Sequence, residues 1–249
     1  MQSIKILVMK KISSFVLIMI MVTTVFAQGN KIPLIGSKAP EFSTNSTNGN
    51  ITFPTDFGKS WKILFSHPAD FTPVCSTELL DLAYFQPEFD ELGVKVAVIS
   101  VDNLEMHQMW KSQLEELNYK NRGPQKITFP ILEDQKATAA NLYGMLHEKV
   151  STERYVRGVF IIDPENIVRS VNFYPMQVGR NISEITRTVE ALQKSDAEHV
   201  LTPANWNEGD DVMVPQYPYT KQQLADNPKL ADEYYSLGNR IWFKKEEGK

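Results

Sequence analysis

Cys75 is the only cysteine of the 249-residue chain, and the residues just before it are of types that activate a thiol. Thr72 and Pro73 precede it, a pair typical of a helix start with threonine at the N-cap and proline at the first helical position. Cys75 is then the third helical residue, where unpaired backbone N–H groups and the positive end of the helix dipole favour a thiolate. Because the thiolate is the nucleophilic form of cysteine, this spacing predicts a reactive thiol.

A helix start alone does not ionise a thiol at neutral pH. An ordinary cysteine, with a pKa of about 8.5, is only a few per cent thiolate at pH 7. Making it mostly ionised requires about 2.7 kcal/mol, whereas a helix terminus typically contributes about 0.3–1 kcal/mol. We expect a fixed cation and hydrogen bonds to supply the remainder, and Arg157 and Arg180 are the candidate cations. Arg180 precedes Asn181, a predicted helix cap where a cation opposes the dipole, so it needs an anionic partner unless it is an ordinary solvated arginine.

A single cysteine also limits the chemistry that the chain can perform. It allows no disulfide within the chain, and it cannot build a thiolate zinc site. Without a Cys-x-x-Cys motif, dithiol–disulfide exchange is excluded, and no nucleophile elbow supports a serine hydrolase. We identify no cluster of metal ligands, so no metal and no cofactor are expected. The alternative interpretation of Cys75 is a small buried hydrophobe, since free cysteine is among the most buried residue types.

The composition is that of a folded globular protein. Hydrophobic residues make up 42% of the chain and charged residues 22%, which excludes a disordered or fibrous protein. The formal net charge of −4 excludes a predominantly basic surface, so no nucleic-acid partner is expected.

The first 27 residues have the order of a secretory signal. Lys10 and Lys11 precede the apolar residues 15–22, and the small-residue site 25–27 follows. We therefore expect residues 1–27 to be cleaved and the protein to be exported, either periplasmic or secreted, with no stable membrane anchor. A retained anchor is the less favoured alternative, because a membrane span needs about 20 apolar residues. In an oxidising compartment an unpaired cysteine indicates an intermolecular bond or a reactive thiol.

Strands and helices alternate through the middle of the chain. We expect strands at residues 62–66, 94–101, 127–132, 158–163 and 167–173, and helices at residues 76–92, 104–117, 135–142 and 182–194. This order predicts an α/β fold with a mixed central sheet covered by helices. Cys75 follows the strand 62–66, and the carboxyl ends of strands are where open α/β sheets bind ligands.

The composition changes near Ser195, which divides the chain into a domain at residues 28–195 and an extension at residues 196–249. Residues 202–219 are rich in proline, asparagine, aspartate and aromatic residues and show no clear periodicity. Disordered termini are poor in aromatic residues, so we expect an ordered arm. It packs either on its own domain or on a second subunit, and the sequence does not separate these two.

Four segments together resemble the peroxiredoxins, a family of thiol-dependent peroxidases. The motif Pro68-x-x-x-Thr72-x-x-Cys75 matches the family signature, and the surrounding residues 66–78 resemble its one-cysteine class. Residues 157–164 and 174–181 match the two strand and loop segments that carry the family's arginines, and residues 202–215 resemble the C-terminal domain of the one-cysteine class. The resemblance implies a thioredoxin-like fold with a small C-terminal dimerisation domain, and a homodimer or larger homo-oligomer.

The resemblance also implies a role for each residue of the motif. Cys75 would be the peroxidatic thiolate that attacks hydrogen peroxide or an organic hydroperoxide and becomes sulfenic acid. The Thr72 hydroxyl would hydrogen-bond the sulfur or the peroxide, and Pro68 would shield the pocket from water. Arg157 would stabilise the thiolate and orient the peroxide. Thr72 and Pro68 have plainer alternatives, since threonine caps helices and proline shapes loops.

Three further residues are assigned supporting roles by the resemblance. Glu78 and Arg180 would form an ion pair that holds Arg157 in place, and His67 would assist near the cysteine. Glu78 is otherwise an ordinary acid in the first turn of a helix. The remaining histidines are predicted to be surface or packing residues: His107, His147 and His199. Three asparagines fit the N-glycosylation pattern, namely Asn45, Asn50 and Asn181, the last more simply explained as a helix cap.

One feature separates the chain from peroxiredoxins that use two cysteines. No second cysteine is present to react with the sulfenic acid of Cys75, so we expect an external thiol to reduce it, through a mixed disulfide. The alternative function is a thioredoxin-like binding or holdase module whose cysteine is inert.

Overall fold

The computed structural model describes residues 32–238 and 240–246, and the predicted signal at residues 1–27 lies outside them. The main domain contains a seven-stranded sheet in the order β2-β1-β5-β4-β3-β6-β7. Its strands are β1 (Phe42–Ser46), β2 (Gly49–Phe53), β3 (Trp61–Ser66), β4 (Val94–Ser100), β5 (Ile131–Glu133), β6 (Arg157–Ile162) and β7 (Val168–Tyr174). Its helices are η1 (Thr55–Phe57), α2 (Pro73–Glu91), α3 (Leu104–Leu114), α4 (Thr138–Tyr143) and α5 (Ile182–Glu198).

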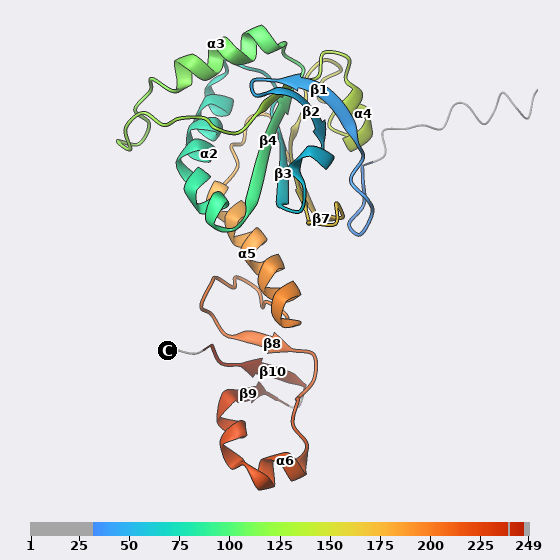
Figure 1. Cartoon of the computed structure of the whole chain (residues 1–249), viewed down its shortest axis with the longest axis vertical. Helices are drawn as coiled ribbons and strands as arrows, with labels where there is room; N and C mark the ends of the chain where they lie inside the picture. The colour runs from blue at the N-terminus through green and yellow to red at the C-terminus, as the bar shows by residue number, and fades with distance from the viewer. Residues whose placement is uncertain (1–31, 239, 247–249) are drawn as a thin grey trace, which may run out of the picture.

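The sheet is mixed, as the sequence predicts. Strands β3, β4 and β5 are parallel, whereas β6 pairs antiparallel with both β3 and β7. β3 and β4 lie at the centre, and all six residues of β3 are buried. Such a strand has to be covered on both faces, and the arrangement of helices in Figure 1 provides that cover.

Two hydrophobic cores lie on opposite faces of the sheet, because successive residues of a strand point to opposite sides. On β3, Ile63 and Phe65 face a core formed with α2, α3 and α5, while Leu64 faces the other core. The second core includes α4 and the β1–β2 hairpin, with Tyr143 and Phe53 among its members. Each full burial of a large apolar side chain contributes roughly 1.5–3 kcal/mol.

Several predicted boundaries need correction. The strand expected at residues 127–132 is only β5, because Pro130 has no N–H for the ladder that begins at Ile131. The helix expected at residues 135–142 starts later, as α4, because Ala137 has a left-handed φ of 54° and the Asp134 carboxylate accepts from the Thr138 N–H. The β1–β2 hairpin was not predicted, although its Asn48-Gly49 pair is a strong hairpin signal.

The other helices, and the predicted hairpin of β6 and β7, agree well with expectation. α2 starts at Pro73, α3 is capped by the Asn103 side chain, and α5 is capped by the Asn181 side chain. α3 stops three residues earlier than predicted, whereas α5 continues to Glu198. The expected domain boundary at 195 therefore lies inside α5.

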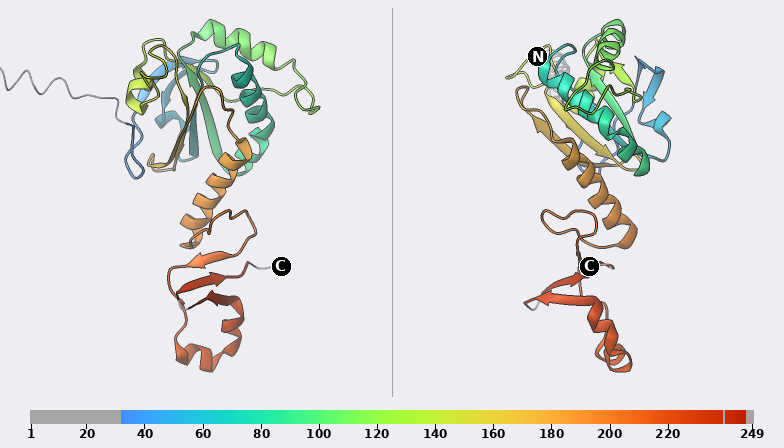
Figure 2. Two further views of the ribbon diagram at one scale, coloured as in Figure 1. Left: turned by 180° about the vertical axis from the view of Figure 1, so that it is seen from behind. Right: turned by 90° about the vertical axis from the view of Figure 1, so that its left-hand side faces the viewer.

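The C-terminal part forms a small sheet of its own at the end of α5 (Figures 1 and 2). Its elements are β8 (Val212–Val214), α6 (Lys221–Asp226), η2 (Pro228–Glu233), β9 (Tyr234–Leu237) and β10 (Ile241–Lys244), with the strands in the order β8-β10-β9. Trp206 is buried against Val200 and Val212 where this part joins α5. Among the described residues, no helix has the length and apolar character that a membrane crossing requires.

Candidate active site

Cys75 lies where β3 ends and α2 begins. β3 stops at Ser66, residues 67–72 form a loop, and Pro73 is the first residue of α2. Cys75 is therefore the third helical residue, as predicted, and its side chain is fully buried. The chain at this point leaves the carboxyl end of a central strand, the position where α/β sheets place their reactive groups.

Arg157 contacts the sulfur directly. The antiparallel pairing of β6 with β3 aligns Val159 with Phe65, so the start of β6 lies beside the end of β3. From there the Arg157 Nη1 donates to the Cys75 Sγ over 3.2 Å and to the Glu78 Oε2 over 2.6 Å. Its Nε and Nη2 both donate to the Met176 carbonyl, over 3.0 and 2.5 Å, which fixes the plane of the guanidinium.

Glu78 connects the two arginines. It follows Cys75 by three residues on α2, so both side chains lie on the same face of the helix. The Arg180 Nε and Nη2 donate to the two Glu78 carboxylate oxygens over 2.8 Å each, and the Arg180 backbone N–H donates over 2.9 Å. Burial acts to raise the pKa of Glu78, but the hydrogen bonds of Arg180 and the charges of both arginines outweigh it and hold the pKa below its usual range.

Arg180 also joins the two strands behind the sulfur. Its Nη1 donates to the carbonyls of Ser66 and Gly158, over 2.8 and 2.9 Å. The Ser66 hydroxyl accepts from the Gly158 N–H, and a Cβ at Gly158 would lie 3.0 Å from that hydroxyl oxygen. A larger residue at this position would require the neighbouring side chains to shift by a few tenths of an ångström.

Thr72 occupies the predicted N-cap position, but its side chain does not cap the helix. The Thr72 hydroxyl instead donates to the Ala69 carbonyl over 2.9 Å, which leaves its oxygen lone pairs to accept a hydrogen bond. Pro68 is buried in the same loop, and Phe71 takes a left-handed φ of 55°. The prediction of side-chain capping is wrong because the tight loop directs the hydroxyl back toward Ala69.

His67 belongs to a buried network that the sequence did not predict. Its Nε2 lies 2.8 Å from the Asp70 Oδ1, and the Nδ1 of His107 lies 2.7 Å from the Asp70 Oδ2. Both imidazoles are fully buried, so the expectation of an ordinary surface or packing role for His107 is incomplete. Asp70 was not singled out, because its partner His107 is 37 residues away.

Three side chains of this network have the spacing of metal ligands. Atoms of His67, Asp70 and Asp102 lie within 4.8 Å of one another. The Asp102 Oδ2 already accepts from the Asp70 N–H and from the Ser100 hydroxyl, and Asp70 already accepts from both imidazoles. These hydrogen bonds account for the arrangement without an ion.

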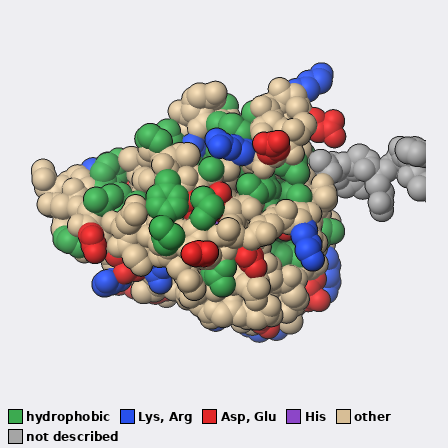
Figure 3. All heavy atoms as spheres, turned by 90° about the horizontal axis from the view of Figure 1, so that it is seen from above, with side chains coloured by type: hydrophobic (Ala, Val, Ile, Leu, Met, Phe, Trp, Pro, Cys, Tyr) green, Lys and Arg blue, Asp and Glu red, His purple; other side chains and the backbone are tan. Residues whose placement is uncertain are grey.

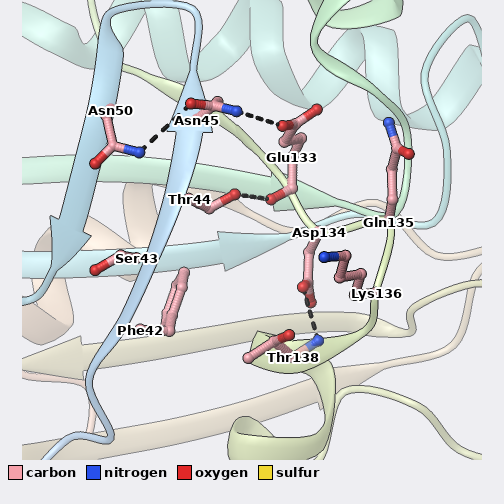
Figure 4. Close-up of a pocket in the computed structure, with 10 residues that line it drawn as sticks. All are labelled: Phe42, Ser43, Thr44, Asn45, Asn50, Glu133, Asp134, Gln135, Lys136 and Thr138. Atoms are coloured by element: carbon pink, nitrogen blue, oxygen red, sulfur yellow. Dashed lines mark hydrogen bonds between the residues drawn. The ribbon is translucent and has the colours of Figure 1, made fainter.

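A separate pocket of about 320 Å³ lies between β1 and the start of α4 (Figure 4). Its polar side chains are engaged with one another: Asn45 donates to Glu133 and Asn50 donates to Asn45. The buried Asp134 accepts from two backbone N–H groups and from the Tyr155 hydroxyl, and burial raises its pKa. Cys75 does not line this pocket, which we therefore do not assign to the thiol chemistry.

Of the seven predicted site residues, the structure brings four into one connected cluster, namely Cys75, Arg157, Glu78 and Arg180. Thr72, Pro68 and His67 lie in the loop that leads to Cys75. A thiol at a helix start and in contact with a guanidinium has the electropositive surroundings that favour the reactive thiolate form.

Comparison with known proteins leads to the same class. Residues 35–171 match the AhpC/TSA family, and residues 191–226 match the C-terminal domain of 1-Cys peroxiredoxin. A peroxiredoxin of Methanosarcina mazei is 48% identical over 185 residues, which cover 74% of this chain and 84% of that protein. A mitochondrial peroxiredoxin of Saccharomyces cerevisiae is 43% identical over 188 residues, covering 73% of this chain and 70% of that protein.

Two solved structures share the fold over most of the chain. The yeast mitochondrial 1-Cys peroxiredoxin, described with a thiol resolving mechanism via glutathione/thioredoxin systems, has a TM-score of 0.71 and 37% identity over 86% of this chain and 100% of that chain. A mutant of peroxiredoxin 6 from Arenicola marina has a TM-score of 0.75 and 30% identity over 86% of this chain and 99% of that chain.

The chain belongs to the peroxiredoxin family, in its one-cysteine class. Its activity is that of a thiol-dependent peroxidase, an oxidoreductase. The alternative of a thioredoxin-like binding or holdase module with an inert cysteine is not favoured.

Glu78→Gln is expected to destabilise the protein by about 3–5 kcal/mol, because it leaves two buried guanidiniums without their counter-charge. The pKa of Glu78 lies below its usual range in the folded state, so its contribution to stability is present above the unfolded pKa of about 4.3 and is lost as the pH falls. The wild-type advantage in the free energy of unfolding should therefore be constant above about pH 5.5 and decline by up to about 1.4 kcal/mol per pH unit below about pH 4.

Urea unfolding of both proteins between acidic and neutral pH measures this difference. Glu184→Gln is the matched control, because Glu184 pairs with a single arginine, Arg187, at the surface of α5. Its removal should cost about 0–1 kcal/mol. Equal losses in the two variants would contradict the structural role of Glu78.

Proposed function

We propose that Cys75 is the peroxidatic nucleophile, with hydrogen peroxide and organic hydroperoxides as substrates. The observation that carries this proposal is the contact of 3.2 Å between the Arg157 Nη1 and the buried Cys75 Sγ. The thiolate attacks one oxygen of the peroxide and the O–O bond breaks. The sulfur becomes sulfenic acid, and the other oxygen leaves with a proton as water or an alcohol.

Arg157 serves both the ground state and the transition state of this step. Its guanidinium provides the fixed cation that a helix start alone does not supply. During the reaction negative charge moves from sulfur to the leaving oxygen, and a donor beside both positions stabilises it without reorganisation. Glu78 and Arg180 are positioning residues, because they hold Arg157 and do not themselves contact the sulfur by hydrogen bonds among the described residues.

The loop residues orient the peroxide. Because the Thr72 hydroxyl donates to Ala69, we assign its free lone pairs to accept the O–H of the peroxide. Pro68, which is buried, would exclude water from the same position. His67 keeps a supporting role through its hydrogen bond to Asp70.

An external thiol completes the cycle. The chain has one cysteine, so the sulfenic acid would condense with a thiol of another molecule, giving a mixed disulfide and water. A second thiol then releases Cys75. Glutathione and a thioredoxin are the first reductants to test, because a yeast relative is described with both systems.

Arg157→Lys is expected to lower the second-order rate constant for hydrogen peroxide by about 100- to 1000-fold, because an ammonium cannot reach the sulfur, Glu78 and Met176 together. Stopped-flow tryptophan fluorescence measures this constant, and Cys75→Ser provides the zero point. Arg154→Lys is the matched control, because Arg154 is exposed three residues earlier. Thiol-dependent peroxidase activity in Cys75→Ser would refute the proposal.

We further propose that the protein acts as a homodimer or larger homo-oligomer. Hydrophobic side chains are exposed at the end of the main domain opposite the C-terminal part (Figure 3), and Phe71, Met106 and Met109 of the active-site loop and α3 are 43%, 36% and 53% exposed. β7 is an edge strand of the large sheet, and the C-terminal sheet carries a cluster of aromatic rings. Such surfaces are typical of contacts between subunits.

Light scattering at micromolar concentration is expected to give at least twice the mass of one chain. Arg154→Lys should leave this mass unchanged, since it keeps the positive charge of an exposed side chain. A monomer under the same conditions would contradict the proposal of a homo-oligomer.

We also propose that the protein is exported and that residues 1–27 are removed. The support is the order of positive, apolar and small residues before Gln28. Intact-mass spectrometry of the protein from its native source is expected to show a chain that begins at Gln28. An amino terminus at Met1 would contradict it.

A further inference from the structure

Asp70 is held by two imidazoles in the interior of the protein. Its Oδ1 lies 2.8 Å from the His67 Nε2, and its Oδ2 lies 2.7 Å from the His107 Nδ1. All three side chains are fully buried. The negative charge of the Asp70 carboxylate therefore needs a positive partner inside the protein, because buried charges that lack a partner are strongly destabilising.

The partners of His107 require a proton on each of its ring nitrogens. Its Nδ1 faces the Asp70 carboxylate, and its Nε2 lies 3.2 Å from the Leu132 carbonyl oxygen. A carbonyl and an ionised carboxylate only accept hydrogen bonds. If both contacts are hydrogen bonds, both nitrogens of His107 donate and the ring is an imidazolium.

His67 is the neutral member of the pair. Its Nε2 donates to Asp70, while its Nδ1 is buried and has no hydrogen-bond partner among the described residues. If His67 were charged, this nitrogen would be a buried donor with its hydrogen bond unmade, the costly case. In the neutral ring the Nδ1 carries only a lone pair.

The charged groups around His107 agree with this assignment. Asp70 faces it from the loop after β3, and Asp102, after β4, accepts from the Asp70 N–H and from the Ser100 hydroxyl. Glu133 of β5 accepts from the first backbone N–H of α3, and Glu105 is on the same helix. Of these acids, Asp70 alone contacts the His107 ring directly, and Glu105 is exposed to solvent.

We propose that His107 carries both ring protons and, through Asp70, positions the loop of residues 67–72 for peroxide reduction. His107 is a positioning residue here, and this role rests on the proposed function of Cys75. Burial acts to raise the pKa of Asp70, but the hydrogen bonds from His107 and His67 outweigh it and lower the pKa, as an ionised carboxylate requires.

The contacts of Asp70 hold the loop of residues 67–72 in a backbone conformation that few residues adopt. Asp70 is fixed through its N–H, its Oδ1 and its Oδ2, by partners on three different segments. The next residue, Phe71, adopts the left-handed φ of 55° that side chains other than glycine rarely take. Thr72 follows directly, so a shift of Asp70 moves the hydroxyl that we assign to the peroxide.

Nitrogen NMR of the wild-type protein with labelled histidine tests the protonation state. At pH 7.5 we expect both ring nitrogens of His107 to be protonated and His67 to hold its single proton on Nε2. The chain has four histidines, so single asparagine variants assign the signals. A His107 ring with one proton, or a charged His67, overturns the proposal.

His107→Asn tests the positioning role, because asparagine keeps an N–H toward Asp70 and removes the charge. We expect the rate constant for hydrogen peroxide to fall by about 10- to 100-fold. His199→Asn is the matched control, since His199 is exposed and its left-handed φ suits asparagine. It should stay within about twofold of wild type. A wild-type rate in His107→Asn overturns the role.

The pair Asp70→Asn and His107→Asn separates a shared role from general damage. If the two residues act as one unit, the double variant loses no more than the worse single variant. Losses that multiply would overturn the proposal. A wild-type protein without peroxidase activity would instead refute the proposed function, and the NMR result would still stand.

Discussion

The site depends on one buried carboxylate that serves two guanidiniums. Glu78 accepts from Arg157 over 2.6 Å and from Arg180 over 2.8 Å, and both of these arginines are buried. Two cations this close in the interior would repel one another without a shared anion, and burial already pulls the pKa of Arg180 downward. With Glu78 ionised, one net positive charge remains in the cluster, and the group that faces it is the sulfur of Cys75. The positive charge that faces the Cys75 sulfur is therefore set by the network of Arg157, Glu78 and Arg180.

The mixed sheet explains why this network can form at all. Cys75 and Glu78 follow β3, whereas Arg157 begins β6, which runs antiparallel to β3. A parallel neighbour would have placed the start of its strand at the opposite edge of the sheet, far from the carboxyl end of β3. Arg180 then precedes α5, and its Nη1 reaches the carbonyls of both strands. Arg180, whose charge is unfavourable beside the start of α5, thus forms hydrogen bonds to β3, β6 and α2.

These contacts also show how far the sequence predicts the site. The position of Cys75 in α2 follows from Thr72 and Pro73, because a helix start is a local feature. The partners of Glu78 are 79 and 102 residues away, so no local pattern identifies them, and they came from the resemblance to a family. The bond between His107 and Asp70 is long-range in the same way, and a lone histidine in a helix gives no signal of it. The direction of the Thr72 hydroxyl depends on a loop whose left-handed residue, Phe71, no turn rule indicates.

Two buried ionic networks thus contact the segment from Ser66 to Cys75. Arg157 of β6 contacts Cys75, and Arg180, which precedes α5, contacts the Ser66 carbonyl. His107 of α3 and Asp102, which follows β4, both contact Asp70. Between these anchors Phe71 and Pro73 are exposed, although Cys75 itself is fully buried. The sulfur of a reducing thiol has to approach Cys75 within bonding distance, because the reduction forms a bond between the two sulfurs. Because Cys75 is fully buried, the approach of a reducing thiol depends on the side chains that cover the sulfur.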